Sequence, residues 1–183
     1  MKKGLLWKTK IYLAGNLETE DYSYAVDWRK DFADKVKEMG IITLSPLEEL
    51  FINYPKEDKD FQDKLKAARA NGEFDYVHEE MVKIRSRDLI CIDVSTCIVA
   101  VINPDKPSWG TVDEIILATR QNKNVFLVIK DGPRRLPLWL FSYFTKEWVF
   151  DNLDQVVDRL KTINEGKIEL DPKYWRLFKE EYL

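Results

Sequence analysis

Short, almost continuous apolar runs alternate with longer polar and apolar segments along the chain. The apolar runs are 11–14, 41–44, 97–102 and 125–129. They are rich in β-branched residues and are bounded by Gly, Pro, Asn or Asp, as is typical of strands buried on both faces of a sheet. These runs predict the strands of a mostly parallel sheet.

Segments of helical periodicity separate the expected strands. In the first, over 24–39, apolar residues recur every three or four positions between Ser23, a candidate N-cap, and Gly40, a C-terminal stop. Further helices are expected at 59–70, 74–92, 111–121 and 152–165. The alternation predicts an α/β fold with helices on both faces of the sheet. At 183 residues, we expect a single domain over 1–183.

The sheet also predicts where to look for function. In such folds, the ligand crevice lies beyond the carboxyl ends of the strands. We therefore expect functional side chains in the segments that follow the strands, namely 15–24, 46–76, 103–110 and 131–137.

Asp88 stands on the apolar face of an expected amphipathic helix. Four apolar residues from Phe74 to Ile84 step by three or four positions, and the next such step reaches Asp88. A carboxylate on a buried stripe needs a hydrogen-bond partner or a function. The pattern leaves open a structural alternative, in which Asp88 pairs with Arg85 or Arg87 or the helix ends before it.

Glu114 lies at the start of the helix that follows the third strand. There, the helix N-terminus would help to keep a nucleophile or general base ionised. The sequence Thr111-x-x-Glu114 also matches a capping box, in which the glutamate only satisfies a backbone N–H. The pattern alone does not choose between these interpretations.

A candidate anion site accompanies Glu114 at the same helix start. It consists of Ser108 and the backbone N–H groups of Gly110 and Thr111, and Gly110 would let a ligand approach the backbone closely. Arg134 and Arg135, after the fourth strand, would add positive charge unless they lie in a solvated loop.

Composition narrows the classes of partner. With 29 basic and 32 acidic residues, the net charge of −3 offers no overall field for a nucleic-acid polymer or an anionic membrane. No apolar run approaches the roughly 20 residues that span a bilayer, and Lys8 interrupts the apolar stretch that a signal peptide needs. We therefore expect a cytoplasmic protein in which Cys91 and Cys97 are reduced and buried.

Residue counts exclude several chemistries. His78 is the single histidine, so neither a zinc-protease helix nor a His/Cys metal cage can form. The seven glycines make neither a dinucleotide fingerprint nor a P-loop. We expect no metal and no cofactor, and a chemistry that depends on carboxylates, hydroxyls and aromatic rings.

Three short pieces of sequence carry a family resemblance when they are taken in order. They are Ile11-Tyr12-Leu13-Ala14-Gly15, Arg87-Asp88-Leu89 and Gly110-Thr111-Val112-Asp113-Glu114. With Asp88 and Glu114 separated by 26 positions, they resemble the nucleoside 2-deoxyribosyltransferase family over about residues 10–130. The resemblance implies a flavodoxin-like (Rossmann-like) sheet. It also implies cleavage or transfer of the N-glycosidic bond of 2′-deoxynucleosides or their 5′-monophosphates.

The resemblance also implies residue roles. Glu114 matches the family's nucleophile, which attacks the anomeric carbon and forms a covalent glycosyl intermediate. Asp88 matches an aspartate that positions the sugar or transfers a proton, and Tyr12 matches a tyrosine that orients the nucleophile. Two carboxylates suit an oxocarbenium-like transition state. The residues expected to contact the substrate are Gly15, Asn16, Ser108, Gly110 and Thr111.

Two positions depart from the family pattern. Transferases of free nucleosides often carry an aspartate six residues before the nucleophile, where this chain has Ser108. A serine there resembles the related deoxynucleoside 5′-monophosphate N-glycosidases, in which it holds phosphate. Asn16 replaces a residue that is often proline. Transferase or hydrolase, and nucleoside or monophosphate, therefore stay open.

Assembly is a further expectation. Family members assemble so that neighbouring subunits complete each pocket, which implies a homo-oligomer. Aromatic residues crowd 139–150, where they would form core or interface or stack a base, and Tyr174-Trp175 is a second candidate contact. The alternative to an enzyme is a non-catalytic nucleotide-binding or sensing module on the same fold, with Glu114 only a cap.

Overall fold

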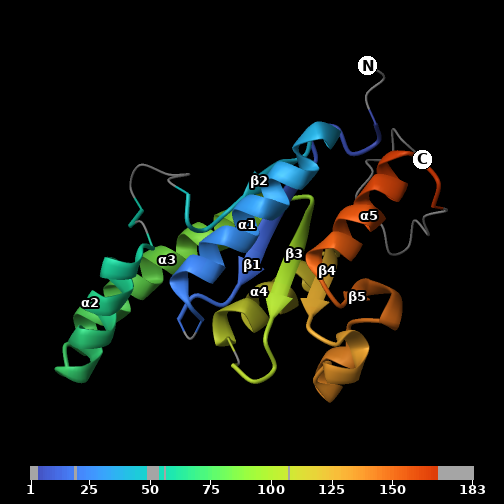
Figure 1. The fold of residues 1–183 in the computed structure, drawn as a ribbon. Helices are drawn as coiled ribbons and strands as arrows, with labels where there is room; N and C mark the ends of the chain where they lie inside the picture. The colour runs from blue at the N-terminus through green and yellow to red at the C-terminus, as the bar shows by residue number, and fades with distance from the viewer. Residues whose placement is uncertain (1–3, 19, 49–53, 56, 107, 169–183) are drawn as a thin grey trace.

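The computed structural model describes residues 4–18, 20–48, 54–55, 57–106 and 108–168. A sheet of five parallel strands lies at its centre, in the order β2-β1-β3-β4-β5 (Figure 1). The strands are β1 (Lys10–Gly15), β2 (Ile42–Leu44), β3 (Cys97–Ile102), β4 (Asn124–Ile129) and β5 (Val149–Phe150). This order is that of flavodoxin-like sheets, so the predicted fold class is confirmed.

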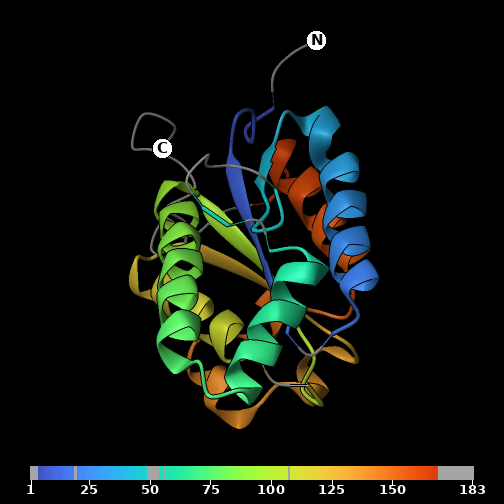
Figure 2. The same cartoon turned by 90° about the vertical axis from the view of Figure 1, so that its left-hand side faces the viewer.

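Helices cover both faces of the sheet, as Figure 2 shows in side view. They are α1 (Tyr22–Val36), α2 (Lys59–Ala70), α3 (Phe74–Val94), α4 (Trp109–Arg120) and α5 (Leu153–Asn164). Helices α1 and α5 pack on one face, α3 and α4 pack on the other, and α2 forms a hairpin with α3. Short 3-10 turns occupy Lys37–Met39, Gly132–Arg135, Leu138–Ser142 and Lys146–Trp148. No helix in these described ranges is long and apolar enough to cross a membrane.

Alternate residues of each strand contribute to two core layers. Leu13 and Val99 face the layer under α1 and α5, whereas Tyr12 and Ile98 face the layer under α3 and α4. Cys91 and Cys97 are free, buried thiols, as predicted. The core layer under α3 and α4 therefore contains a polar side chain, that of Tyr12.

The strand order reverses between β1 and β3, which pair from Ile11 opposite Cys97 to Gly15 opposite Val101. Beyond this point, side chains tie the two following loops together. The Asn16 amide donates to the Lys106 carbonyl at 3.2 Å, and Glu20 accepts from the Asn103 amide at 2.8 Å. The loops that border the predicted crevice are thereby fixed to each other.

Several expected boundaries shift by a few residues. Helix α1 begins at Tyr22 because Asp21, not Ser23, accepts hydrogen bonds from the first free N–H groups. Helix α4 begins at Trp109, with Ser108 as its N-cap. Strand β5 was not expected, since its two residues are too few to show a pattern.

The apolar stripe predicted along α3 is wrong for the first half of the helix. Phe74 and Met81 are 67% and 46% exposed, and burial begins only at Ile84. The N-terminal half of α3 extends past the sheet with α2 beside it (Figure 1), so those residues have no sheet to cover. The largest buried side chain of α3 is charged: Arg87 is 2% exposed.

Candidate active site

A tyrosine and a glutamate meet on the face of the sheet that α3 and α4 cover. The Tyr12 hydroxyl, on β1, donates to Glu114 Oε1, on α4, at 2.6 Å. Tyr12 is fully buried and Glu114 is partly buried, and the two are 102 residues apart in sequence. Parallel pairing of β1 with β3, followed directly by α4, brings them together.

The capping-box interpretation of Glu114 is wrong. Ser108 caps α4, with its hydroxyl accepting from the Thr111 N–H at 3.3 Å. Thr111 is therefore inside the helix, and Glu114 lies in the second turn, past the free N–H groups. Its carboxyl group instead accepts the hydrogen bond of Tyr12.

Asp88 joins this pair from α3, and it also has the arginine partner that the structural alternative required. Its Oδ1 accepts from Arg87 Nε at 3.1 Å and from Nη2 at 2.8 Å. The Tyr12 hydroxyl also lies close enough for a hydrogen bond that lowers the pKa of Asp88. The structure thus brings together Tyr12, Asp88 and Glu114, which the sequence analysis singled out.

Arg87 extends the cluster toward the segment before α2. Its Nη2 donates to Glu57 Oε2 at 2.7 Å, and its Nη1 donates to the Pro55 carbonyl at 3.2 Å. The Glu57 side chain is 12% exposed. A buried charge of this kind is tolerated because carboxylates and a carbonyl satisfy its donors.

The electrostatics of the cluster favour retention of a proton. Burial, followed by repulsion from Asp88, raises the pKa of Glu114 to about 8. Burial also raises the pKa of Asp88, although Arg87 and Tyr12 act against it. Burial and the two carboxylates raise the pKa of Tyr12 well above its usual value, so the hydroxyl stays a donor. The carboxyl groups of Asp88 and Glu114 form a coupled pair, because ionisation of one disfavours ionisation of the other.

Arg29, on α1, supplies a second buried cation. Its guanidinium donates to the carbonyls of Leu13 at 3.3 Å, Ala25 at 2.6 Å and Gly15 at 2.9 Å. Burial lowers its pKa to about 10, while the negative charges of the cluster act in the opposite direction. It therefore holds the end of β1 in place and adds positive charge near the carboxyl groups of the cluster.

Gly15 is explained by packing. A Cβ at this position would lie 2.9 Å from the Trp28 ring and 3.2 Å from Arg29 Nη2. The glycine thus makes room for two side chains of α1. No observation here connects it with a substrate.

The other expected substrate contacts lie at the start of α4 and directly after β1. Ser108 and Thr111 share a hydrogen bond between their hydroxyl oxygens at 2.9 Å, and Gly110 is exposed with open space where a Cβ would stand. Asn16 is buried, and its Oδ1 accepts from the Glu18 N–H at 3.1 Å. Substrate contact by these residues stays a prediction.

The region after β4 divides into buried and exposed parts. Arg135 pairs with Asp105 at 2.7 Å, and Arg134 is exposed. Phe144 and Phe150 are core residues, whereas Trp139 is 71% exposed. Tyr174-Trp175 lies outside the described residues.

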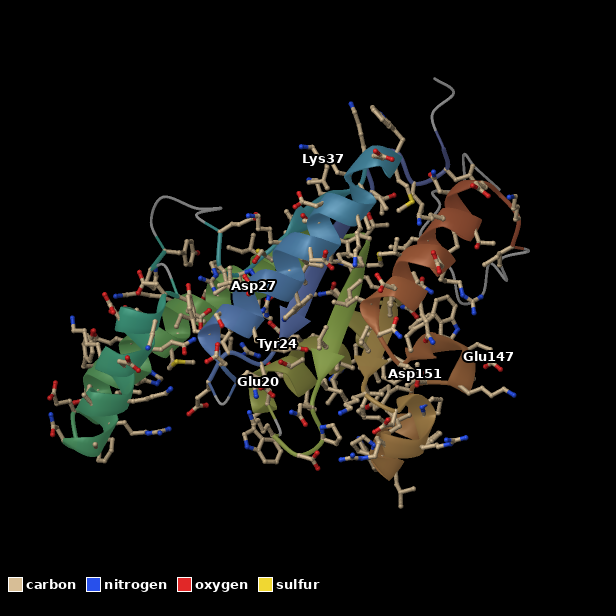
Figure 3. All side chains as sticks on the ribbon, in the orientation of Figure 1. Glu20, Tyr24, Asp27, Lys37, Glu147 and Asp151 are labelled. Carbon is tan, nitrogen blue, oxygen red and sulfur yellow. The ribbon has the colours of Figure 1, made fainter. Side chains whose placement is uncertain are left out.

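Among the pockets near the carboxyl edge of the sheet, two lie on opposite sides of it. The larger, about 590 Å³, lies near the N-terminal ends of α1 and α5, where Figure 3 labels Glu20, Tyr24 and Asp151. Its floor includes Val101 and Val128, which belong to the core layer opposite Tyr12. Neither Tyr12 nor either carboxyl of the coupled pair lines it.

The smaller pocket, about 300 Å³, adjoins the cluster. It lies between α2, α3 and the loop after β1, and Glu57 forms part of its wall. Because Glu57 contacts Arg87, and Arg87 contacts Asp88, this pocket is connected to the coupled carboxyls by two ion pairs.

Sequence reasoning missed Arg29 and Glu57. Arg29 follows Ala25 by four residues and precedes Phe32 by three, so the argument that identified Asp88 would have identified it as well. Glu57 lies in the 46–76 connection, which was expected to hold functional residues, but no spacing distinguishes it from the other acidic residues there.

The chemistry available at this site follows from the coupled pair. One carboxylate that is ionised beside a carboxylic acid that holds a proton is the combination that cleaves glycosidic bonds. Within the described ranges, no three His, Cys, Asp or Glu side chains are grouped so that they could hold a metal ion.

Comparisons with known proteins agree with this chemistry. A sequence profile of the nucleoside 2-deoxyribosyltransferase family matches residues 11–159. A search of curated proteins found no match. Among solved structures, a 2-deoxyribosyltransferase from Bacillus psychrosaccharolyticus has a TM-score of 0.51 at 16% identity, covering 82% of this chain and 91% of that one. This likeness supports the fold.

Two further structures are similar at lower scores. A conserved protein from Enterococcus faecalis V583 has a TM-score of 0.45 at 20% identity, with 86% of this chain and 88% of that chain covered. The CMP N-glycosidase BcmB of Clostridium botulinum has a TM-score of 0.46 at 14% identity, with 84% and 98% covered.

The raised pKa of Glu114 predicts a pH-dependent contribution to stability. An acid that binds its proton more tightly in the folded chain destabilises the fold as pH rises from its ordinary 4.5 toward about 8. Glu114→Gln keeps an acceptor for Tyr12 and removes the titration. In urea unfolding, the unfolding free energy of the variant relative to that of the wild type should rise across this pH window. The expected rise is about 2 kcal/mol after allowance for solvent screening. A difference in unfolding free energy that is independent of pH would contradict the coupled pair.

Proposed function

The chain belongs to the nucleoside 2-deoxyribosyltransferase family, and from this premise we propose that it is a cytoplasmic enzyme acting on 2′-deoxynucleosides or their 5′-monophosphates. Its reaction would cleave or transfer the N-glycosidic bond through a covalent intermediate on Glu114. We take 1–183 as one domain of this family. The observation that carries the proposal is the convergence of Tyr12, Asp88 and Glu114 from three separate elements.

The first step of the proposed reaction forms a glycosyl ester. A Glu114 carboxylate oxygen attacks the anomeric carbon, the carbon–nitrogen bond breaks, and its electron pair leaves with the base. Because Glu114 is the group whose pKa is raised to about 8, the proton that it holds must first move to Asp88, and Asp88 then gives it to the leaving base. The Tyr12 hydroxyl, at 2.6 Å from Glu114 Oε1, orients the attacking group.

The second step releases the sugar. A nitrogen of another base, or a water oxygen, attacks the same carbon and Glu114 leaves as a carboxylate. The proton of the incoming nucleophile returns to the carboxyl pair, so the enzyme is regenerated. Transfer and hydrolysis differ only in which nucleophile arrives first.

Replacement of Glu114 tests the proposal. Glu114→Gln should fold and lose at least about a thousandfold in kcat, because the amide is a poor nucleophile. Tyr12→Phe leaves Glu114 in place, so its kcat should fall by a smaller factor. Release of base from deoxynucleosides and their monophosphates, followed by chromatography, measures both. Wild-type turnover in Glu114→Gln would contradict the nucleophile assignment, and a wild type that binds but never cleaves would favour the sensing module.

The site also bears on whether the preferred substrate carries a 5′-phosphate. Ser108 stands beside the N-terminal N–H groups of α4, where a hydroxyl would donate a hydrogen bond to a phosphate group that an aspartate would repel. Its capping bond to Thr111 uses one lone pair of the hydroxyl oxygen. We propose that 5′-monophosphates are the preferred substrates.

The phosphate preference can be measured with a substitution that keeps the cap. Aspartate caps helices about as well as serine, so Ser108→Asp should retain α4. In the wild type, kcat/KM should favour a monophosphate over its nucleoside by roughly tenfold or more, since charge-assisted hydrogen bonds contribute about 1.5–3 kcal/mol. Ser108→Asp should flatten or invert that ratio. Equal constants in the wild type would favour free nucleosides.

We also propose that the enzyme is a homo-oligomer. Leu138, Trp139 and Phe141 are 89%, 71% and 48% exposed in one short segment after β4, and such apolar exposure is typical of a contact surface. Light scattering should give a mass above 21.7 kDa. Trp139→Ser should reduce the mass, and Phe74→Ser, at an exposed position on α3, should not. A wild-type monomer would contradict the proposal.

A further inference from the structure

The 300 Å³ pocket beside the coupled carboxyls has the size and lining of a site for a small planar ring. Leu65 of α2 and Val77 and Met81 of α3 give it apolar walls. Pockets of this kind bury the ligand against apolar side chains, and a few polar groups decide which ligand is accepted. The polar group that also contacts the cluster is Glu57.

Glu57 presents a fixed acceptor to this pocket. Its Oε2 is held by Arg87 at 2.7 Å, and Oε1 has no hydrogen-bond partner among the described residues. Burial raises the pKa of Glu57, and the guanidinium of Arg87 acts against this rise by favouring the ionised form. An ionised carboxylate can only accept hydrogen bonds. Glu18, the second carboxylate of the lining, differs in that it is exposed and pairs with exposed Arg69 at 3.1 Å.

We infer that Glu57 selects bases that carry an exocyclic amino group, such as cytosine or adenine, over bases with a carbonyl at the same ring position. An amino group donates to the carboxylate oxygen, as acidic side chains accept from the amino group of cytosine elsewhere. A base with a carbonyl oxygen at that position would place this oxygen against the carboxylate oxygen of Glu57. Both atoms are acceptors, so the buried carboxylate would be left unsatisfied. The inference rests on the proposed function, since it places the base of a nucleoside in this pocket.

A glutamine at position 57 tests this inference, because Arg87 would also set the orientation of its amide group. In Glu57→Gln, the amide oxygen is held by the guanidinium, so the NH₂ group takes the place of Oε1. A donor then replaces the acceptor without a change in shape. The variant keeps a hydrogen bond to Arg87 and should fold.

The experiment compares two matched pairs of substrates, each with and without a 5′-phosphate. They are deoxycytidine against deoxyuridine, and deoxyadenosine against deoxyinosine. In the pair that the wild type accepts, kcat/KM should favour the amino-bearing member by roughly tenfold or more. Glu57→Gln should bring the ratio to about one or invert it, whereas Glu79→Gln, at an exposed position of α3 outside the lining of the pocket, should retain the wild-type ratio. Equal or better use of the carbonyl-bearing member by the wild type, or an unchanged ratio in Glu57→Gln, would overturn the inference.

Equilibrium binding separates this inference from the proposed function. Calorimetry of the same compounds with the Glu114→Gln variant needs no turnover. Amino-selective binding without any cleavage by the wild type would uphold the role of Glu57 and refute the enzymatic proposal. Cleavage without amino selectivity would do the reverse, and an absence of binding for all of the compounds would overturn both.

Discussion

The balance of charge in a small, poorly solvated space is the constraint on which the site depends. Three carboxyl groups, those of Asp88, Glu114 and Glu57, share this space with the guanidinium groups of Arg87 and Arg29. If every group were ionised, one negative charge would be in excess. Burial of an excess charge is costly, and retention of one proton removes it. The raised pKa of Glu114 is the consequence. The proposed reaction needs the same single proton on Asp88, so that Glu114 is the carboxylate that attacks and Asp88 is the acid.

Different strands and helices of the fold position the different groups of the site. Strand β1 carries Tyr12 into the layer under α3 and α4, while its end is fastened from the opposite face by Arg29 through the Leu13 and Gly15 carbonyls. The parallel pairing of β1 and β3 then brings α4, and with it Glu114, back over Tyr12. Each reacting group is thus attached to a regular element, and none depends on a flexible loop for its position.

The sequence predicted the sheet and its helices well, because continuous apolar runs and helical periodicity are properties of single segments. It identified Asp88 through such a pattern, even though the first half of that stripe, at Phe74, turned out to be exposed beyond the sheet. Contacts between distant segments have no such signal. The capping box of Glu114 looked complete in sequence, and only the position of Ser108 at the helix start shows that the carboxyl is free for Tyr12. Glu57 belongs to the site through an arginine 30 residues away.

The most direct test of the account is whether Glu114 becomes glycosylated during turnover. A 2′-fluorinated deoxynucleoside or its monophosphate would slow breakdown of the ester, since fluorine destabilises an oxocarbenium-like transition state. After acid quenching and proteolysis, mass spectrometry should find one sugar unit on the peptide that contains Glu114, at up to one per chain. Turnover of the substrate with no adduct, or with the sugar on Asp88 instead, would contradict the account.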